Sequence, residues 1–290
     1  MSLVITNNVS SLQAQNNFAR TNSMLSKTLE RLSSGLKINS GADGPAALVI
    51  SEQQRAQIAG LNAALANTTK AISLVQTGEG ALNEVNSLLN KARSLALDAA
   101  NAGVNDQDSL DADEAELSNI ISTVDSIANR TQFGSKKLLD GTAGAQNFQI
   151  GANAGDTATV TFLDARTTAL GIGAVGVVNP AFTSLSTIHI NTTAADAADS
   201  IRVIDKAIED VTTMRGTLGA FQANTLESTS NNLRTMLQNT TVAESTVRDT
   251  DFALETSNLA KYQVLAQAGA AVLSNSNQST QLVLALLQKL

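Results

Sequence analysis

Apolar residues recur every three or four positions along most of this chain, a spacing typical of one buried face of an α-helix. The longest such run covers residues 58–89. Pro45 predicts where this helix starts, because proline tolerates the first helical position. A helix from Pro45 to Ala100 would be about 80 Å long at 1.5 Å per residue. We therefore predict a rod, with a bend or break at Gly78 and Gly80.

Weaker helical patterns occupy the two ends of the chain. The N-terminal pattern changes register, which predicts a discontinuity near Asn22. The C-terminal pattern holds small or polar side chains at half of its positions. Such helices are marginal alone, so we expect them to cover each other or to be covered by neighbouring copies of the chain. The predicted polymerisation and coiled-coil seam consists of Val9, Leu12, Leu25, Leu29, Leu32, Leu259, Tyr262, Leu273, Val283 and Leu287.

The middle of the chain changes character. Residues 147–150 and 157–162 are short β-type runs separated by a glycine-containing segment, which predicts a hairpin. Residues 164–183 are predicted to form a loop, and residues 185–190 a further strand. A helix after a loop at 101–109 should pack antiparallel on the long helix, and helix resumes near Ala194.

Together these patterns predict a mainly α fold. We expect an elongated antiparallel helical rod or coiled coil, with paired N- and C-terminal helices and a small β-hairpin region in the middle. An ordinary helical bundle is the alternative, because heptad-like spacing alone does not separate the two. The weak helices at both ends of the rod favour assembly.

Composition narrows the classes of function. The chain has 290 residues, 2 Pro, 7 Phe and no Trp, and such a core of small aliphatic residues suits helix–helix seams. A net charge of -7 argues against nucleic-acid binding, which needs basic patches. The acidic run at 104–129 is interpreted as a solvated helix face. We recognise no cleavable signal peptide, and the apolar run at 282–287 is too short to cross a bilayer.

Candidate catalytic and metal-binding patterns fail on inspection. The chain has no cysteine and one histidine, His189, which we expect to face solvent on a strand. Gly171, Gly173 and Gly176 have the spacing of a dinucleotide-binding loop, but no helix opens after them. An acidic segment starting at Asp106 lacks the glycine and glutamate of a calcium loop. We therefore expect no enzyme activity, no cofactor and no metal.

The stretch RLSSGLKINSGADGPAALVIS, residues 31–51, resembles the start of bacterial flagellins. The resemblance continues through IANRTQFGSKKLLDG and AQAGAAVLSNSNQS and covers nearly the whole chain in order. It implies a structural subunit that polymerises into the flagellar filament for swimming motility. The implied domains are a filament-core domain at 1–34 and 255–290, a spoke linker at 35–45, a helical rod domain at 46–163 and 194–254 with the hairpin at about 147–162, and a short variable insert at 164–193.

The family resemblance also implies partners and a location. These are other copies of the chain, the flagellar export apparatus, a flagellin chaperone at the C-terminal helix, and the filament cap and hook-junction proteins. The implied location is the extracellular flagellum. A host Toll-like receptor is a further partner of the family, and its epitope corresponds here to Lys91, Leu95 and Glu116. Lys91 stands where Arg is common, and Ser94 where Glu is frequent.

Two other functions stay open at this point. A hook–filament junction protein shares both terminal helices but forms a short adaptor instead of a long polymer. An adhesin on a helical stalk would need an aromatic or charged patch in residues 164–193, where the sequence offers only Phe182 and Arg166.

Overall fold

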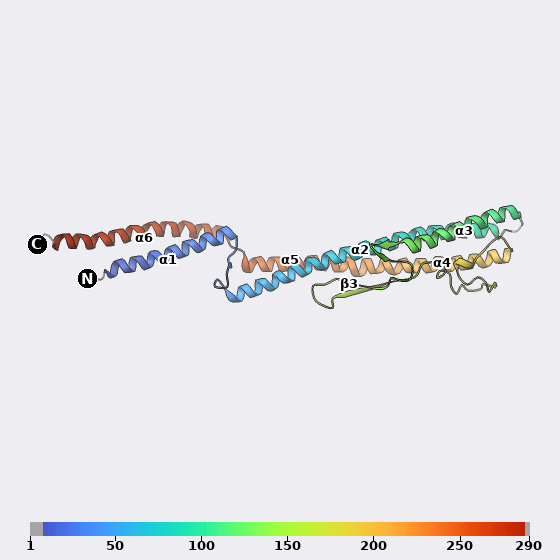
Figure 1. Cartoon of the computed structure of the whole chain (residues 1–290), viewed down its shortest axis with the longest axis horizontal. Coiled ribbons are helices and arrows are strands. Elements are labelled where there is room, and N and C mark those ends of the chain that lie inside the picture. The colour runs from blue at the N-terminus through green and yellow to red at the C-terminus, as the bar shows by residue number, and fades with distance from the viewer. Residues whose placement is uncertain (1–7, 102, 288–290) are drawn as a thin grey trace. The chain divides into compact units, whose positions relative to one another are not determined.

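The computed structural model describes residues 8–101 and 103–287, with side chains described as far as Gln278. The described residues form six α-helices, two short helical segments and two small antiparallel sheets (Figure 1). The mainly α prediction with a small β region is confirmed. The elements are α1 (Val9–Ser34), α2 (Pro45–Ala99), α3 (Gln107–Arg130), β1 (Gln132–Phe133), β2 (Lys136–Lys137), β3 (Gly144–Gln149), β4 (Thr157–Phe162), η1 (Leu185–Thr187), α4 (Ala194–Ala220), η2 (Phe221–Glu227), α5 (Ser228–Arg248) and α6 (Phe252–Leu287).

The chain divides into two compact units. Unit 1 comprises Met1–Ile58 and Gln238–Leu290, and so brings the two ends of the sequence together. Unit 2 is the continuous segment Ala59–Leu237. None of the described helices is both long and apolar enough to span a bilayer.

The helix boundaries follow local capping chemistry. The carboxylate of Asp106 accepts a hydrogen bond from the Ser109 N–H at 2.9 Å, and the Thr193 hydroxyl accepts one from the Asp196 N–H at 3.1 Å. Each bond satisfies a backbone donor that the first helical turn leaves unpaired. The predicted helix starts at Pro45 and near Ala194 are both observed.

Two predicted breaks are absent. α1 continues through Asn22, and α2 continues through Gly78 and Gly80. In α1 the covered positions form one stripe with helical spacing along the whole helix, at Ser11, Ala14, Phe18, Thr21, Leu25, Thr28 and Leu32. Several of these residues are small or polar, so counting apolar residues alone gave a false change of register.

The core of unit 2 joins three helices and the hairpin. Leu89 of α2, Leu117 of α3 and Ile204 of α4 are fully buried in one cluster, which also contains Val160 and Phe162 of β4. α3 runs back along α2, and Lys91 of α2 forms an ion pair with Glu116 of α3. The predicted antiparallel hairpin is observed between β3 and β4, with Gly144 opposite Phe162 and Gln149 opposite Thr157. The small β1–β2 pair was not predicted.

The segment between β4 and α4 is part of this core. Leu170, Phe182, Leu185, Ile188 and Ile190 are all buried in it. The predicted strand at 185–190 is wrong, because residues 185–187 form the 3-10 turn η1 instead. His189 does not face solvent as expected: it is half-buried, and its ring meets the edge of Phe182 with centroids 4.7 Å apart.

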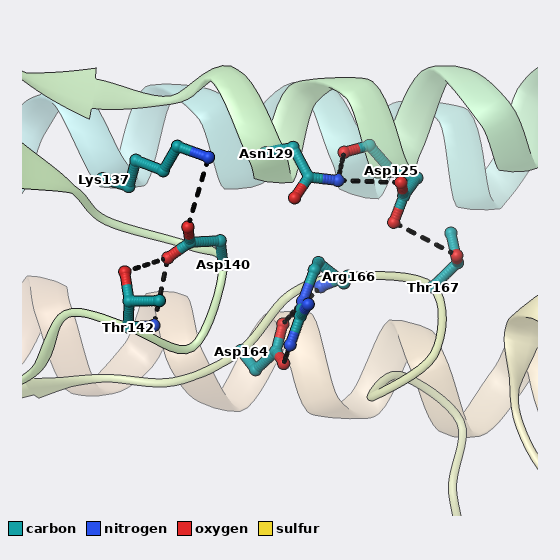
Figure 2. Close-up of polar contacts among 8 residues, drawn as sticks. All are labelled: Asp125, Asn129, Lys137, Asp140, Thr142, Asp164, Arg166 and Thr167. Atoms are coloured by element: carbon teal, nitrogen blue, oxygen red, sulfur yellow. Dashed lines mark hydrogen bonds and ion pairs between the residues drawn. The ribbon is translucent and has the colours of Figure 1, made fainter.

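Polar contacts fix the loops on either side of the hairpin (Figure 2). Arg166 binds Asp164 through two nitrogens, with Nη2 at 2.6 Å from Oδ2. Asp140 accepts bonds from the backbone N–H and the hydroxyl of Thr142 and pairs with Lys137 at 3.5 Å. The Arg166 guanidinium lowers the pKa of Asp164 although partial burial opposes that shift. These loops are therefore tied down by charge-assisted bonds.

The helix α4 continues through η2 into α5 without leaving helical backbone angles. Ala220, the last residue of α4, has φ -63° and ψ -42°, and Ser228, the first residue of α5, has φ -60° and ψ -45°. The π-helical segment between them places Leu226 in the core and Phe221 6.4 Å from Phe148 of the hairpin. Nothing in the apolar spacing predicted this segment.

Two glycines of α2 should respond oppositely to the same substitution. A Cβ on the buried Gly78 would lie 3.0 Å from a ring carbon of Phe162, whereas one on the exposed Gly80 would meet nothing within 4 Å. Gly78→Val should lower the free energy of unfolding by about 1–3 kcal/mol through overpacking. Gly80→Val should leave it equal or raise it by a few tenths, about the difference in helix propensity. Urea unfolding of both variants tests this, and equal effects would contradict the packing role of Gly78.

The Asp164–Arg166 pair predicts a specific acid dependence. The folded-state pKa of Asp164 is lowered, so its contribution to stability is present above the ordinary value of 3.8 and is lost as pH falls through the folded value. Asp164→Asn should therefore be less stable than the unmodified chain at pH 6, and the gap should narrow toward pH 2. Urea unfolding at several pH values measures the gap, and a gap that does not change with pH would exclude this role.

Candidate functional site

The strongest candidate site is the pair of terminal helices in unit 1. α1 and α6 lie side by side (Figure 1). The Asn8 amide donates to the Ser276 carbonyl at 3.1 Å, and the Ser11 hydroxyl donates to Asn277 Oδ1 at 2.7 Å. At the other end, Arg31 of α1 pairs with Glu255 of α6. Rising numbers in α1 thus meet falling numbers in α6, and the pair is antiparallel.

Small residues allow the two helices to approach closely. A Cβ added at Gly269 of α6 would lie 3.2 Å from Cδ2 of Phe18 in α1, so glycine leaves room for the ring there. The half-buried stripe of α6 passes through that glycine with helical spacing, at Leu259, Tyr262, Ala266, Gly269, Leu273 and Ser276.

The predicted seam residues separate into two groups. The structure places Leu25 and Leu32 on the covered stripe of α1, and Leu259, Tyr262 and Leu273 on that of α6. It leaves Val9, Leu12 and Leu29 exposed in the single chain. The side chains of Val283 and Leu287 lie outside the described residues. Within one chain, the structure does not bring all the seam residues together.

An apolar face of α6 is also left uncovered, and it lies outside the predicted seam. Val264 is 64% exposed and Val272 is 59% exposed, and Phe252, Leu254 and Leu265 are exposed as well. The pair of terminal helices therefore carries apolar side chains on surfaces that none of the described residues of unit 1 covers. Exposed apolar patches of this kind mark interaction sites. The signal in the sequence was the surplus of apolar residues beyond one helical stripe.

A buried ion pair joins the C-terminal end of α1 to the N-terminal end of α6. Glu255 is only 5% exposed, and its Oε1 is 3.9 Å from Nη1 of Arg31. Asn258 donates a further, long bond to the same carboxylate at 3.5 Å. Counting back four residues from Leu259 along the stripe reaches Glu255, so the helical spacing could have located it.

The segment between α1 and α2 is anchored at both ends. Gly35 ends α1 with φ 74°, and its carbonyl accepts a bond from the Thr250 N–H at 3.0 Å. Further along, the Asp43 carboxylate accepts bonds from the Asn39 and Ser40 N–H groups and pairs with Lys27 of α1 at 2.6 Å. The Lys27 ammonium and the Ser40 donors hold the pKa of Asp43 well below its usual range. The segment therefore has a fixed path.

The predicted receptor epitope lies in unit 2. Lys91 Nζ is 2.5 Å from Glu116 Oε1, and both side chains are about half exposed. Leu95, one turn further along α2, packs against the edge of the core. The structure thus brings the three residues to one face of α2 and α3. Among the described residues, no group of three or more acidic or histidine side chains is placed to hold a metal ion.

The Arg31–Glu255 pair should fix how the terminal helices meet. Arg31→Met leaves the carboxylate buried without its partner, which should cost about 1–3 kcal/mol. Replacing both residues, as Arg31→Met with Glu255→Leu, should recover most of that loss. The matched control is Arg55→Met, which removes an exposed pair with Glu52 and should change little. Amide hydrogen exchange of the first turns of α6 measures the effect, and equal exchange in all three variants would refute it.

Comparisons with known proteins cover nearly the whole chain. The model of the bacterial flagellin N-terminal helical region matches residues 5–144, and that of the C-terminal helical region matches residues 201–287. The chain is 41% identical to a flagellin of Bacillus subtilis, covering 98% of this chain and 99% of the relative. It is 34% identical to a flagellar filament 31.3 kDa core protein of Treponema maltophilum, covering 99% of this chain and 100% of that one.

A solved structure gives a further similarity. The crystal structure of Bacillus cereus flagellin is 30% identical in sequence and superposes with a TM-score of 0.47, covering 58% of this chain and 88% of that chain. The two family models and the near full-length identity to the B. subtilis protein decide the assignment. This chain belongs to the bacterial flagellin family.

Proposed function

We propose that this chain is a structural subunit that polymerises through its terminal helices into the bacterial flagellar filament, which drives swimming. The observation that carries the proposal is the pair of terminal helices with uncovered apolar faces. Covering a Val or Leu side chain fully contributes about 1.5–3 kcal/mol, so several such residues on α1 and α6 supply a driving force for association. Val264 and Val272 are the clearest examples.

The arrangement of these faces suits an open polymer. Exposed apolar residues lie on both α1, at Val9 and Leu12, and α6, at Val264 and Val272. Two different faces on one subunit can make heterologous contacts, and such contacts generate helical filaments when the rotation does not close a ring. The closed pairing of α1 with α6 inside one chain leaves both faces free for neighbouring copies.

We also propose a location and partners for the subunit. We place the assembled subunit outside the cell, exported by the flagellar export apparatus. An apolar α6 needs cover before export, and a flagellin chaperone at the C-terminal helix would provide it. The filament cap and hook-junction proteins would contact subunits at the two ends of the filament. We keep a Toll-like receptor of the host as a further partner, at Lys91, Leu95 and Glu116, where the ion pair with Glu116 already engages Lys91.

The alternative is a hook–filament junction protein. The named relatives that cover this chain almost fully are flagellins and filament core proteins. The length of the assembly separates the two functions, because a junction protein forms a short adaptor.

Charges on the uncovered face of α6 should prevent assembly. Val264→Asp with Val272→Asp would place carboxylates where neighbouring copies pack, and burying an unpaired charge is strongly unfavourable. The variant should form no filaments while unit 2 keeps its thermal unfolding transition. The matched control, Val264→Ile with Val272→Ile, should assemble as the unmodified chain does.

Negative-stain microscopy and sedimentation of purified protein, with and without short filament seeds, measure the assembly. Normal filaments from the aspartate variant would refute the role of this face. Short rings or monomers from the unmodified chain, even with seeds, would favour the junction protein.

A further inference from the structure

A loop of unit 2 presents apolar side chains to solvent. Between β4 and α4, residues 170–179 alternate in direction: Leu170, Ala174 and Val177 pack against the core. Three apolar residues of the same loop point outward: Val175 is 92% exposed, Val178 is 83% exposed, and Ile172 is exposed as well. We call the outward set Ile172, Val175 and Val178 the apolar knob.

The loop that carries the knob is held rigidly on α4. One oxygen of the buried Asp199 carboxylate accepts bonds from the Val178 and Asn179 N–H groups, both at 2.8 Å. Arg202 Nη1 donates to the Gly176 carbonyl at 2.7 Å and to the other Asp199 oxygen at 2.7 Å. Side chains of α4 therefore bind the polar backbone groups of this loop and hold the knob in a fixed position.

The start of the loop lies directly against α4. The N–H of Gly171 donates to Asp210 at 3.1 Å, and a Cβ at this residue would lie 2.8 Å from the Val203 carbonyl oxygen. Gly171 also has φ 75°, which favours glycine. Three ordered branched side chains held out in water indicate a contact surface, and a preformed surface loses little conformational entropy on binding.

Unit 2 also contains a groove whose apolar lining matches the apolar knob. It has a volume of about 290 Å³ and lies between the turn of the β3–β4 hairpin and α5. Its apolar lining comes from Ile150, Leu233 and Met236. The single charged residue of the lining is Asp156, which forms no ion pair within the described part of the chain.

The knob cannot reach the groove of its own chain. Arg202, at the base of the knob, and Asn232, in the wall of the groove, belong to one continuous helical run through α4, η2 and α5. Thirty residues separate them, which at 1.5 Å per residue is about 45 Å. The knob can therefore enter this groove only on another copy of the chain.

We propose that the apolar knob of one copy docks in the hairpin groove of a second copy in the assembled polymer. This inference rests on the proposed function, because polymerisation brings copies together. The chain carries a net charge of -7, so a contact between copies has to avoid acidic surface or pair it. The knob has no charged side chain, Arg202 lies at its base with almost half of its side chain exposed, and Asp156 lies at the groove. The contact joins two different surfaces, so it propagates along a polymer.

The absence of cysteine from the chain gives a clean cross-linking test. Val175→Cys with Met236→Cys should give a ladder of disulfide-linked oligomers when assembled filaments are oxidised, and little when free subunits are oxidised at the same concentration. The matched control is Val175→Cys with Thr235→Cys, whose second cysteine lies one residue outside the groove lining and should give at most a weak ladder. Equal ladders from both pairs, or filaments without any ladder, would overturn the proposal.

A second measurement tests the proposal even if the double-cysteine variant forms no filaments. Val175→Asp should raise the critical concentration for filament growth about tenfold or more, and Val175→Ile should leave it unchanged. An unchanged value for Val175→Asp would overturn the docking. If the unmodified chain forms no filaments with seeds, the proposed function itself fails. Filaments that form normally without the knob contact refute this inference alone.

Discussion

The antiparallel packing of α1 on α6 is the contact on which the proposed function depends. Its contact face is narrow because small residues such as Ala14, Ala266 and Gly269 occupy much of it. A narrow seam leaves larger apolar residues on other sides of both helices. The pair thus has enough internal contact to order two weak helices and enough uncovered surface to bind further copies. A wider seam, built from Leu and Phe at every covered position, would have buried the apolar surface of both helices within one chain.

In unit 2, by contrast, an irregular segment of the chain is buried against long helices. The segment between β4 and α4 contributes five large apolar side chains to the core, and its polar backbone is satisfied by carboxylates of α4 such as Asp199 and Asp210. In the loops around Asp140 and Asp164, these carboxylates themselves accept bonds from the backbone N–H groups of Thr142 and Arg166. Side-chain carboxylates thus replace the sheet partners that this backbone lacks, as buried polar groups require.

The sequence predicted the elements well where the spacing of apolar residues agreed with helix chemistry. Pro45 and the stretch near Ala194 marked real helix starts, and the covered stripe of α6 matched the predicted steps from Leu259 to Leu273. Prediction was weaker for α1, whose covered face includes Ser11, Thr21 and Thr28, because a count of apolar residues passes over such positions. The burial of His189 and the Arg31–Glu255 pair depend on contacts between distant residues, which spacing along one segment cannot reveal.

The pairing of the two chain ends sets the order in which the molecule folds. Asn8 and Ser276, which join α1 to α6, are separated by 268 positions in the sequence. Unit 2 is one continuous segment, so its contacts form over shorter separations. Closing a long loop is entropically costly and slow, so we expect the terminal pair to be the last part of the native structure to form. During synthesis, α1 has no partner until α6 has been made, so the surface proposed to bind other copies forms only after α6 is complete.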